Sequence, residues 1–193
     1  MNSLEAALRR VAEDLNKSGL PWALVSGFAV SARVEPRFTR DIDIAVLVDD
    51  DLAAEALVRS LISDGYTASS SVEHDSGRLA MVRLNSVRGD AVVVALLFAS
   101  SGIEAEIAQA AEAVEITPGL NVPLATAGHL IALKILARDD LGRPQDAADL
   151  RAFRSVARRE DLALAEEAIV LIDARRFSRG RDLRRAFADF VTS

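Results

Sequence analysis

The stretch SGFAVSARVEPRFTRDIDIAV, residues 26–46, decides the fold of this chain because it links two strands through a tight turn and a helix. The short apolar run WALVS at 22–26 predicts the first strand. Small residues follow at the turn, and FAVSAR at 28–33 predicts a brief helix. The alternating run DIDIAVLV at 41–48 predicts the second strand.

An Asp-x-Asp pair begins the second of these strands. Side chains at positions i and i+2 of a strand share a face, so Asp41 and Asp43 point to the same side, and Ala45 continues that face into the core. Two carboxylates about 6–7 Å apart along a strand repel each other unless a cation lies between them. Oxygen ligands of this kind suit Mg²⁺, which also binds substrate phosphates. Acids at a strand end also occur without a metal, and that alternative stays open.

The residues around the acid pair can contact phosphate. Ser26 and Gly27 follow a strand and open a helix, where free backbone N–H groups face an anion and glycine permits close approach. Arg37, Thr39 and Arg40 precede the acids and offer donors to phosphate oxygens. A phosphate cradle beside a two-acid metal site predicts metal-assisted phosphoryl or nucleotidyl transfer.

Composition excludes several other classes of protein. The chain has 193 residues, no cysteine and two histidines, so disulfides, thiolate metal sites and a cysteine nucleophile are excluded. No apolar run approaches 18 residues, and the N-terminus is an amphipathic helix with acids rather than a secretory signal. We therefore expect a cytoplasmic protein with no membrane partner.

The net charge of −6 is distributed unevenly. Residues 1–150 contain 13 Lys and Arg against 22 Asp and Glu, whereas residues 151–193 contain 10 Arg against 7 acids. The arginines of the second segment are spaced along predicted helices. Either they form a solvated helical face, or they form a local surface that contacts the phosphates of a polyanion.

The pattern along the chain predicts an α+β fold. Strands are expected at 22–26, 41–48, 66–72, 78–84, 91–98, 113–116 and 121–124. Helices are expected at 4–17, 28–33, within 49–65 after a cap of acids, at 101–111 opening on a capping box SGIE, and at 127–139, 144–157, 160–175 and 180–191. We therefore expect a mixed sheet flanked by helices over residues 1–124 and a C-terminal helical bundle over residues 125–193, packed on the first unit.

A lone lysine lies in the apolar helix HLIALKILA. Lys134 either extends to solvent, or it has a buried partner such as phosphate or Asp149. Asp146 follows Pro144 and is interpreted either as a first-turn acid favoured by the helix dipole or as part of a functional face with Asp149. The two histidines, His74 and His129, are expected to be structural or exposed.

The stretch SG…RFTRDIDIAV resembles the signature of polymerase-β-type nucleotidyltransferases, a small-residue turn followed by Asp-hydrophobic-Asp. Over most of its length, including LLFASSGIEAEI and GHLIALKILARDDLGRPQDAADL, the chain is similar to the AbiEii/MenA-type toxins of type IV toxin–antitoxin and abortive-infection systems. The resemblance implies the polymerase-β-type nucleotidyltransferase fold and Mg²⁺-dependent transfer of a nucleotide from an NTP. It also implies a tRNA 3′ end as acceptor and a cognate antitoxin as partner.

The same resemblance assigns roles to individual residues. Asp41 and Asp43 match the metal-binding acids. The residues that match the nucleotide-binding positions are Ser26, Gly27, Thr39, Arg40 and Lys134. Lys134 and Asp149, the latter a downstream acid of the toxin branch, join Asp41 and Asp43 as the implied catalytic set.

One position departs from the pattern. Related enzymes add a third carboxylate from a neighbouring strand, and VVVALLF has Ala95 at that place. Asp90 is five residues away and would face the opposite side of the strand. Loss of a general base typically lowers a rate 10²–10⁴-fold without abolishing it. Two alternatives therefore stay open: a catalytically inactive protein that binds a nucleotide or an antitoxin, and an enzyme whose acceptor is a small molecule or a protein.

Overall fold

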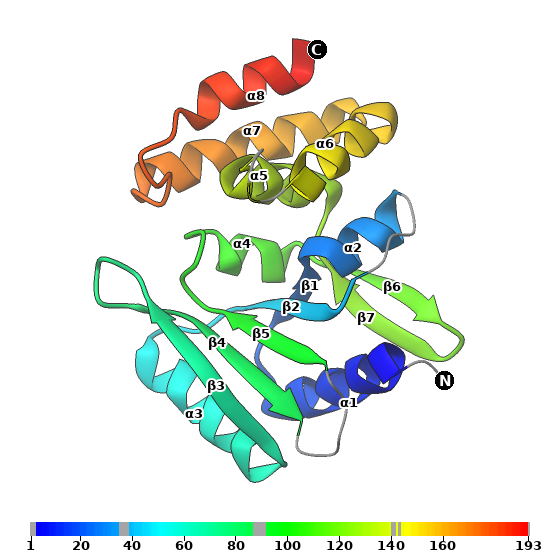
Figure 1. Cartoon of the computed structure of the whole chain (residues 1–193), viewed down its shortest axis with the longest axis vertical. Helices are drawn as coiled ribbons and strands as arrows, with labels where there is room; N and C mark the ends of the chain where they lie inside the picture. The colour runs from blue at the N-terminus through cyan, green and yellow to red at the C-terminus, as the bar shows by residue number, and fades with distance from the viewer. Residues whose placement is uncertain (1–2, 35–38, 87–91, 140–141, 143, 193) are drawn as a thin grey trace.

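A seven-stranded mixed sheet forms the centre of the molecule in a computed structural model that describes residues 3–34, 39–86, 92–139, 142 and 144–192. The strand order is β3-β4-β5-β2-β1-β7-β6 (Figure 1). The pairs β1–β7 and β2–β5 are parallel and the other pairs are antiparallel. The strands are β1 (Trp22–Val25), β2 (Asp41–Val46), β3 (Tyr66–Glu73), β4 (Leu79–Ser86), β5 (Val93–Leu97), β6 (Glu112–Thr117) and β7 (Leu120–Leu124).

Helices cover both faces of the sheet. In Figure 1, α1 and α3 lie on one side, α2 and α4 lie on the other, and α5–α8 form a group beyond α2 and α4. The helices are α1 (Ser3–Ser18), α2 (Ser26–Arg33), α3 (Asp51–Ser63), α4 (Glu104–Gln109), α5 (Ala127–Ala137), α6 (Pro144–Val156), α7 (Arg159–Ala174) and α8 (Leu183–Thr192). The predicted α+β architecture is confirmed. Within the described residues, no helix has the length and apolar character needed to cross a bilayer.

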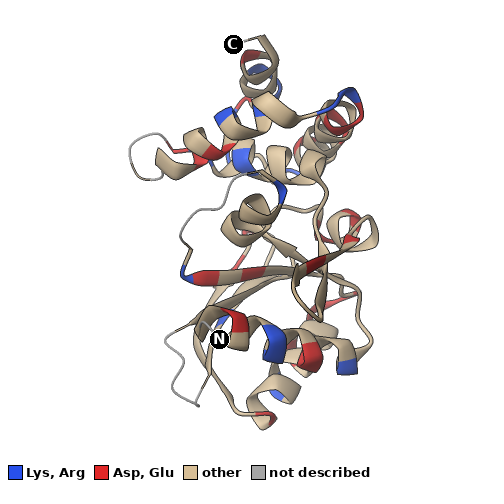
Figure 2. Ribbon diagram, turned by 90° about the vertical axis from the view of Figure 1, so that its right-hand side faces the viewer, with Lys and Arg blue, Asp and Glu red and all other residues tan. Residues whose placement is uncertain are grey.

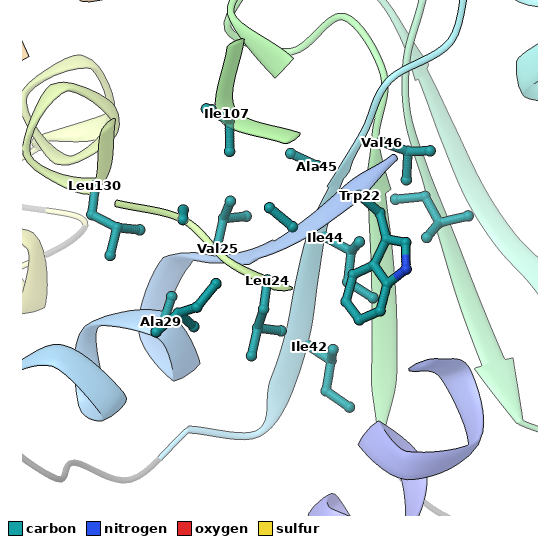
Figure 3. Packing of buried hydrophobic residues seen from close by; sticks show 14 of the residues in the cluster. Trp22, Leu24, Val25, Ala29, Ile42, Ile44, Ala45, Val46, Ile107 and Leu130 are labelled. Atoms are coloured by element: carbon teal, nitrogen blue, oxygen red, sulfur yellow. The ribbon is translucent and has the colours of Figure 1, made fainter. Parts of the chain in front are cut away.

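The alternation of β2 explains its central place. Ile42 and Ile44 are fully buried, and so is Ala45 on the opposite face. In Figure 3, Val25 and Ala45 lie on the side of the strands that faces Ile107 of α4, and Ile42 and Ile44 lie on the other side. The strand is thus apolar on both faces except at Asp41 and Asp43, near its start.

The helix caps were predicted with mixed success. Asp50 caps α3 by accepting a hydrogen bond from the Ala53 N–H at 2.8 Å, as expected from the run of acids. The capping box predicted at 101–104 forms only in part: α4 begins at Glu104 with Ile103 at its N-cap, but the Glu104 carboxylate accepts from the Ser101 N–H at 2.6 Å. The chain turns at Gly102, whose φ is +76°, and the preceding N–H groups therefore converge on the Glu104 carboxylate. That carboxylate accepts from the N–H groups of Ser100, Ser101 and Gly102 and from the Ser101 hydroxyl.

The C-terminal arginines largely bind protein groups. Arg175 donates to the Glu106 carboxylate at 2.6 and 3.0 Å and to the Gly102 carbonyl. Arg179 donates to the Ser100 carbonyl at 3.0 Å, and Arg181 donates to the Leu136 carbonyl at 2.7 Å. These three side chains are thus held by protein groups, although Arg175 and Arg179 remain exposed to solvent. Figure 2 shows basic and acidic residues interspersed along the C-terminal helices rather than one continuous basic face.

An aromatic contact completes this attachment. Phe177 stacks on His74 of the β3–β4 turn with ring centroids 4.0 Å apart. We call residues 175–181 the clamp, because they join the α7–α8 connection to the β3–β4 turn and the β5–α4 connection of the sheet unit. His74 is therefore structural, as predicted.

Candidate functional site

The acid pair lies at the start of β2, beside the end of β1. Asp41 is exposed and Asp43 is half-buried, and both precede the buried Ala45 on one face. Asp43 pairs with Val25, the last residue of β1, in an antiparallel register. The turn that begins at Ser26 therefore starts directly next to Asp43, which brings two separated parts of the predicted site together.

The turn itself has an unusual backbone. Ser26 has a φ of 60°, in the left-handed region that glycine adopts readily and other residues adopt rarely. Gly27 is buried within the first turn of α2. Val25 at the N-cap provides no side-chain hydrogen bond, so the first N–H groups of α2 are not capped by a side chain and can receive an anion.

Two of the predicted phosphate donors, Thr39 and Arg40, directly precede the acid pair. The Thr39 hydroxyl donates to the Asp41 carbonyl at 3.3 Å, which fixes the chain as it enters β2. Arg40 is exposed next to Asp41. Arg37 and Asp90 lie outside the described residues.

Ala95 stands where a third carboxylate was expected. Parallel pairing of β2 with β5 sets Ala95 directly opposite Asp43, so the two side chains share a face. The residue is 3% exposed. The register therefore agrees with the position inferred from the sequence, and a methyl group occupies it.

Lys134 is buried between two acids. Its ammonium group bonds the Asp146 carboxylate at 2.7 Å and the Asp149 carboxylate at 2.8 Å, and the side chains of all three are 4% exposed or less. Extension of Lys134 to solvent is thus wrong, because α5 packs among α2, α6, α7 and α8. Asp146 is more than a first-turn acid; the sequence signal for it was its position one helical turn before Asp149. We call these three residues the buried triad.

The acid pair has the donor chemistry that Mg²⁺ prefers. Two carboxylates on one accessible strand face, with no sulfur or imidazole among them, fit a magnesium ion that completes its shell with water and substrate phosphates. Among the described residues, no group of three or more His, Asp, Glu or Cys side chains is placed to hold a metal ion. Asp41 and Asp43 therefore fit a metal held jointly by protein and phosphate.

A separate cavity lies between α4, α5 and α7. Its volume is about 320 Å³, and its lining residues include Glu106, His129 and Leu171. Burial lowers the pKa of His129, and its Nδ1 lies 2.9 Å from the Thr126 hydroxyl. The hydrogen bonds from Arg175 lower the pKa of Glu106. None of the predicted site residues lines this cavity.

Solved structures share the fold over nearly the whole chain. A crystal structure of an antigenic nucleotidyltransferase-like protein from Paracoccidioides brasiliensis is 18% identical with a TM-score of 0.54, covering 96% of this chain and 92% of that one. A solution structure of the antibiotic-resistance factor ANT(2″)-Ia is 20% identical with a TM-score of 0.57, covering 98% and 100%. A crystal structure of ANT(2″)-Ia with adenylyl-2″-tobramycin is 18% identical with a TM-score of 0.60, covering 93% and 100%.

No curated protein sequence matches the chain. A family model described as nucleotidyl transferase AbiEii toxin, type IV TA system, matches residues 7–191. That range includes the acid pair, the turn at Ser26 and the buried triad. The chain therefore belongs to the AbiEii family of nucleotidyltransferase toxins.

Proposed function

We propose that this nucleotidyltransferase uses Mg²⁺ to move a nucleotide from an NTP to the 3′-terminal hydroxyl of a tRNA, as the toxin of a type IV toxin–antitoxin system. One observation carries the proposal. The register Val25–Asp43 sets the uncapped start of α2 beside two carboxylates on one strand face. An anion cradle and an acid pair thus share one end of the sheet, which suits a metal-bound triphosphate.

Each predicted residue has a part in this proposal. Asp41 and Asp43 hold the metal, which when bound neutralises phosphate charge. The backbone at Ser26 and Gly27, with Thr39 and Arg40, holds the triphosphate oxygens.

The Lys134 ammonium group has three N–H donors, of which Asp146 and Asp149 accept two. In this proposal the third donates to the triphosphate. In this proposal Asp149 and Asp146 are positioning residues, because they touch the lysine.

The reaction is an in-line displacement at the α-phosphorus. The acceptor oxygen forms a bond to the α-phosphorus while the bond from that phosphorus to the β-bridging oxygen breaks. Pyrophosphate leaves with the electron pair, and the proton of the acceptor hydroxyl passes to water, because Ala95 provides no base. The residues of the turn and Lys134 stabilise the charge that develops on the leaving pyrophosphate.

Labelled transfer tests the proposal. The protein is incubated with Mg²⁺, each of the four α-labelled NTPs and total tRNA, and Asp43→Asn is compared with wild type. Asp43 is half-buried at a strand start, so the variant is expected to fold and to lose more than 100-fold in rate. Label on RNA that is insensitive to Asp43→Asn would reject the proposed site.

Ala95 supports a second candidate, a member of the family that binds nucleotide or antitoxin without turnover. Its methyl group lies opposite Asp43, where a base would otherwise assist the acceptor. Calorimetry with an NTP and Mg²⁺ that shows binding, together with no label on any acceptor, would favour this candidate. Because one structural neighbour is a complex with adenylyl-2″-tobramycin, the acceptors tested include an aminoglycoside and a protein extract.

A further inference from the structure

Arg83 lies in the same row of the sheet as the acid pair. It pairs with Ala95 across β4 and β5, and Ala95 pairs with Asp43 across β5 and β2. Residues directly opposite one another on neighbouring strands share a face. Arg83 therefore projects from the face that carries Asp43, with its Cα about 10 Å away across two strand spacings.

The face around Arg83 is open. Val82 and Leu84 are buried on the other side of β4, whereas Arg83 is exposed and Asn85 is half-buried. Helix α3 packs on β3 and β4, on the face of Val82 and Leu84. Helix α4 packs on β1 and β2. A molecule that approaches the acid pair over β5 and β4 thus reaches Arg83.

The guanidinium group of Arg83 is available. Other arginines of the sheet unit bind protein groups: Arg9, Arg10, Arg33, Arg59 and Arg78. Within the described residues, the side chain of Arg83 makes no hydrogen bond or ion pair. Because a guanidinium keeps its charge at every physiological pH, an anion is its natural partner.

The order of the strands separates the two substrates. The turn at Ser26 and α2 follow β1, on one side of β2, and α5 packs on α2. β5 and β4 lie on the other side of β2. A triphosphate held by the turn occupies the β1 side, so the acceptor enters from the side of Ala95 and Arg83.

We propose that Arg83 binds a phosphodiester of the acceptor strand next to the attacking hydroxyl and so selects an anionic, nucleic-acid acceptor. The inference rests on the proposed function and deepens it. A positively charged aminoglycoside is disfavoured at this position, since no described carboxylate on β4 or β5 faces it. Ala95 is 3% exposed and offers no polar group, so the acceptor contacts this row of the sheet through Asp43 and Arg83. Arg83 is thus a positioning and specificity residue.

Binding and kinetics of Arg83→Gln test the proposal. Anisotropy of a fluorescent RNA with a free tRNA-like 3′ end is measured without NTP at several salt concentrations. The variant is expected to bind about tenfold more weakly, and its salt dependence falls by about one phosphate contact. In transfer assays, KM for RNA rises by a similar factor, while kcat and KM for the NTP stay unchanged. Arg83→Lys recovers part of the RNA affinity because it keeps the charge.

Arg59→Gln is the matched control. Arg59 is exposed on α3 and pairs with Glu55, so this variant loses the same charge away from the site. Equal RNA binding and equal acceptor KM in the two variants would overturn the proposal. A loss of NTP binding in Arg83→Gln would also overturn it, since Arg83 would then belong to the donor side.

The two proposals fail in different ways. If wild type binds RNA through Arg83 but labels no acceptor, the transfer function is rejected and the RNA contact stands. If wild type binds no RNA yet labels a different acceptor, the Arg83 proposal is rejected and the nucleotidyl-transfer site stands.

Discussion

Ser26 has a backbone conformation that its side chain disfavours, at the point where the chain meets the acid pair. A left-handed φ in a residue other than glycine costs of order 1–3 kcal/mol, and such residues gather at functional sites. The φ of 60° at position 26 therefore favours glycine or another small residue at this turn.

This conformation predicts how position 26 tolerates substitution. Ser26→Gly is expected to keep the fold and nucleotide affinity, because glycine adopts a φ of 60° without strain. Ser26→Val is expected to lower the free energy of unfolding by about 1–3 kcal/mol and to weaken NTP binding, since a β-branched residue is a genuine outlier there. Urea denaturation and calorimetry measure both quantities. Equal stability of the two variants would contradict the prediction.

The lowered pKa of His129 predicts a pH dependence of stability. Burial lowers the pKa from its ordinary value of 6.5, so the folded state resists a proton that the unfolded state accepts. Above pH 6.5 both states are neutral, and below it the free energy of unfolding falls, by at most about 1.4 kcal/mol per pH unit. His129→Gln is expected to remove this component below pH 6.5.

Glu106 acts in a different range of pH. Its pKa is lowered from 4.5, so its contribution is present above that value and is lost as the pH falls through the folded-state pKa. Thermal melts of wild type and His129→Gln just below pH 6.5 check the prediction for His129. An unchanged slope of stability against pH in the variant would contradict that prediction.

At the scale of elements, α5 and α6 are joined through the buried triad. A lysine that bonds two buried acids is a strong coupling between helices, because removal of one partner leaves charges in a low-dielectric interior. Breaking such a pair typically costs 3–5 kcal/mol.

Lys134→Met is therefore expected to lower the free energy of unfolding by about 3–5 kcal/mol. The triple variant with Asp146→Asn and Asp149→Asn is expected to recover much of this loss, since the uncompensated charges are removed. Arg59→Met is the control, because Arg59 and its partner Glu55 are both exposed and such a pair contributes little. Guanidinium denaturation of the variants gives the comparison; a Lys134→Met protein as stable as Arg59→Met would contradict the buried pairing.

Sequence periodicity identified the elements well, for physical reasons. Alternation in DIDIAV and the apolar run in VVALL leave few options besides buried strands, and all seven expected strands are present. Periodicity contains no information on distant partners. Three arrangements depend on the register and packing of remote segments, so the sequence did not reveal them. They are the Asp146–Lys134 pair, the Arg175–Glu106 pair, and the position of Arg83 in the same row of the sheet as Asp43.

At the scale of the whole molecule, the clamp fixes the C-terminal helices to the sheet unit. Arg175 bonds Glu106 and Gly102, and Phe177 packs so closely on Gly102 that an added Cβ would lie 2.5 Å from its ring. The boundary between the predicted units at residues 124 and 125 stays a prediction, and this attachment makes their independent motion costly.

Arg175→Ala is expected to release the clamp. It removes two hydrogen bonds to a partly exposed carboxylate and one to a carbonyl, worth about 1–2 kcal/mol after allowance for solvent. Hydrogen exchange should rise in residues 175–181 and in the β3–β4 turn, with little change in β1 and β2. Arg176→Ala, beside it in the chain, is the control, because no described residue bonds its side chain. Exchange that rises equally in both variants would contradict this role.

The parallel pairing of β1 with β7 brings the segment that leads into Lys134 next to the strand that leads into the turn at Ser26. Leu24 pairs with Leu124, one hundred residues later, and the residues of the buried triad lie still further along the chain. Contacts between such distant residues form slowly, because a long loop must close before they are gained. The single tryptophan, Trp22, pairs with Val46 and reports on the nearer β1–β2 contact. In refolding experiments we expect its fluorescence to recover before nucleotide binding does, so that a newly made chain folds for some time as an inert protein before its site exists.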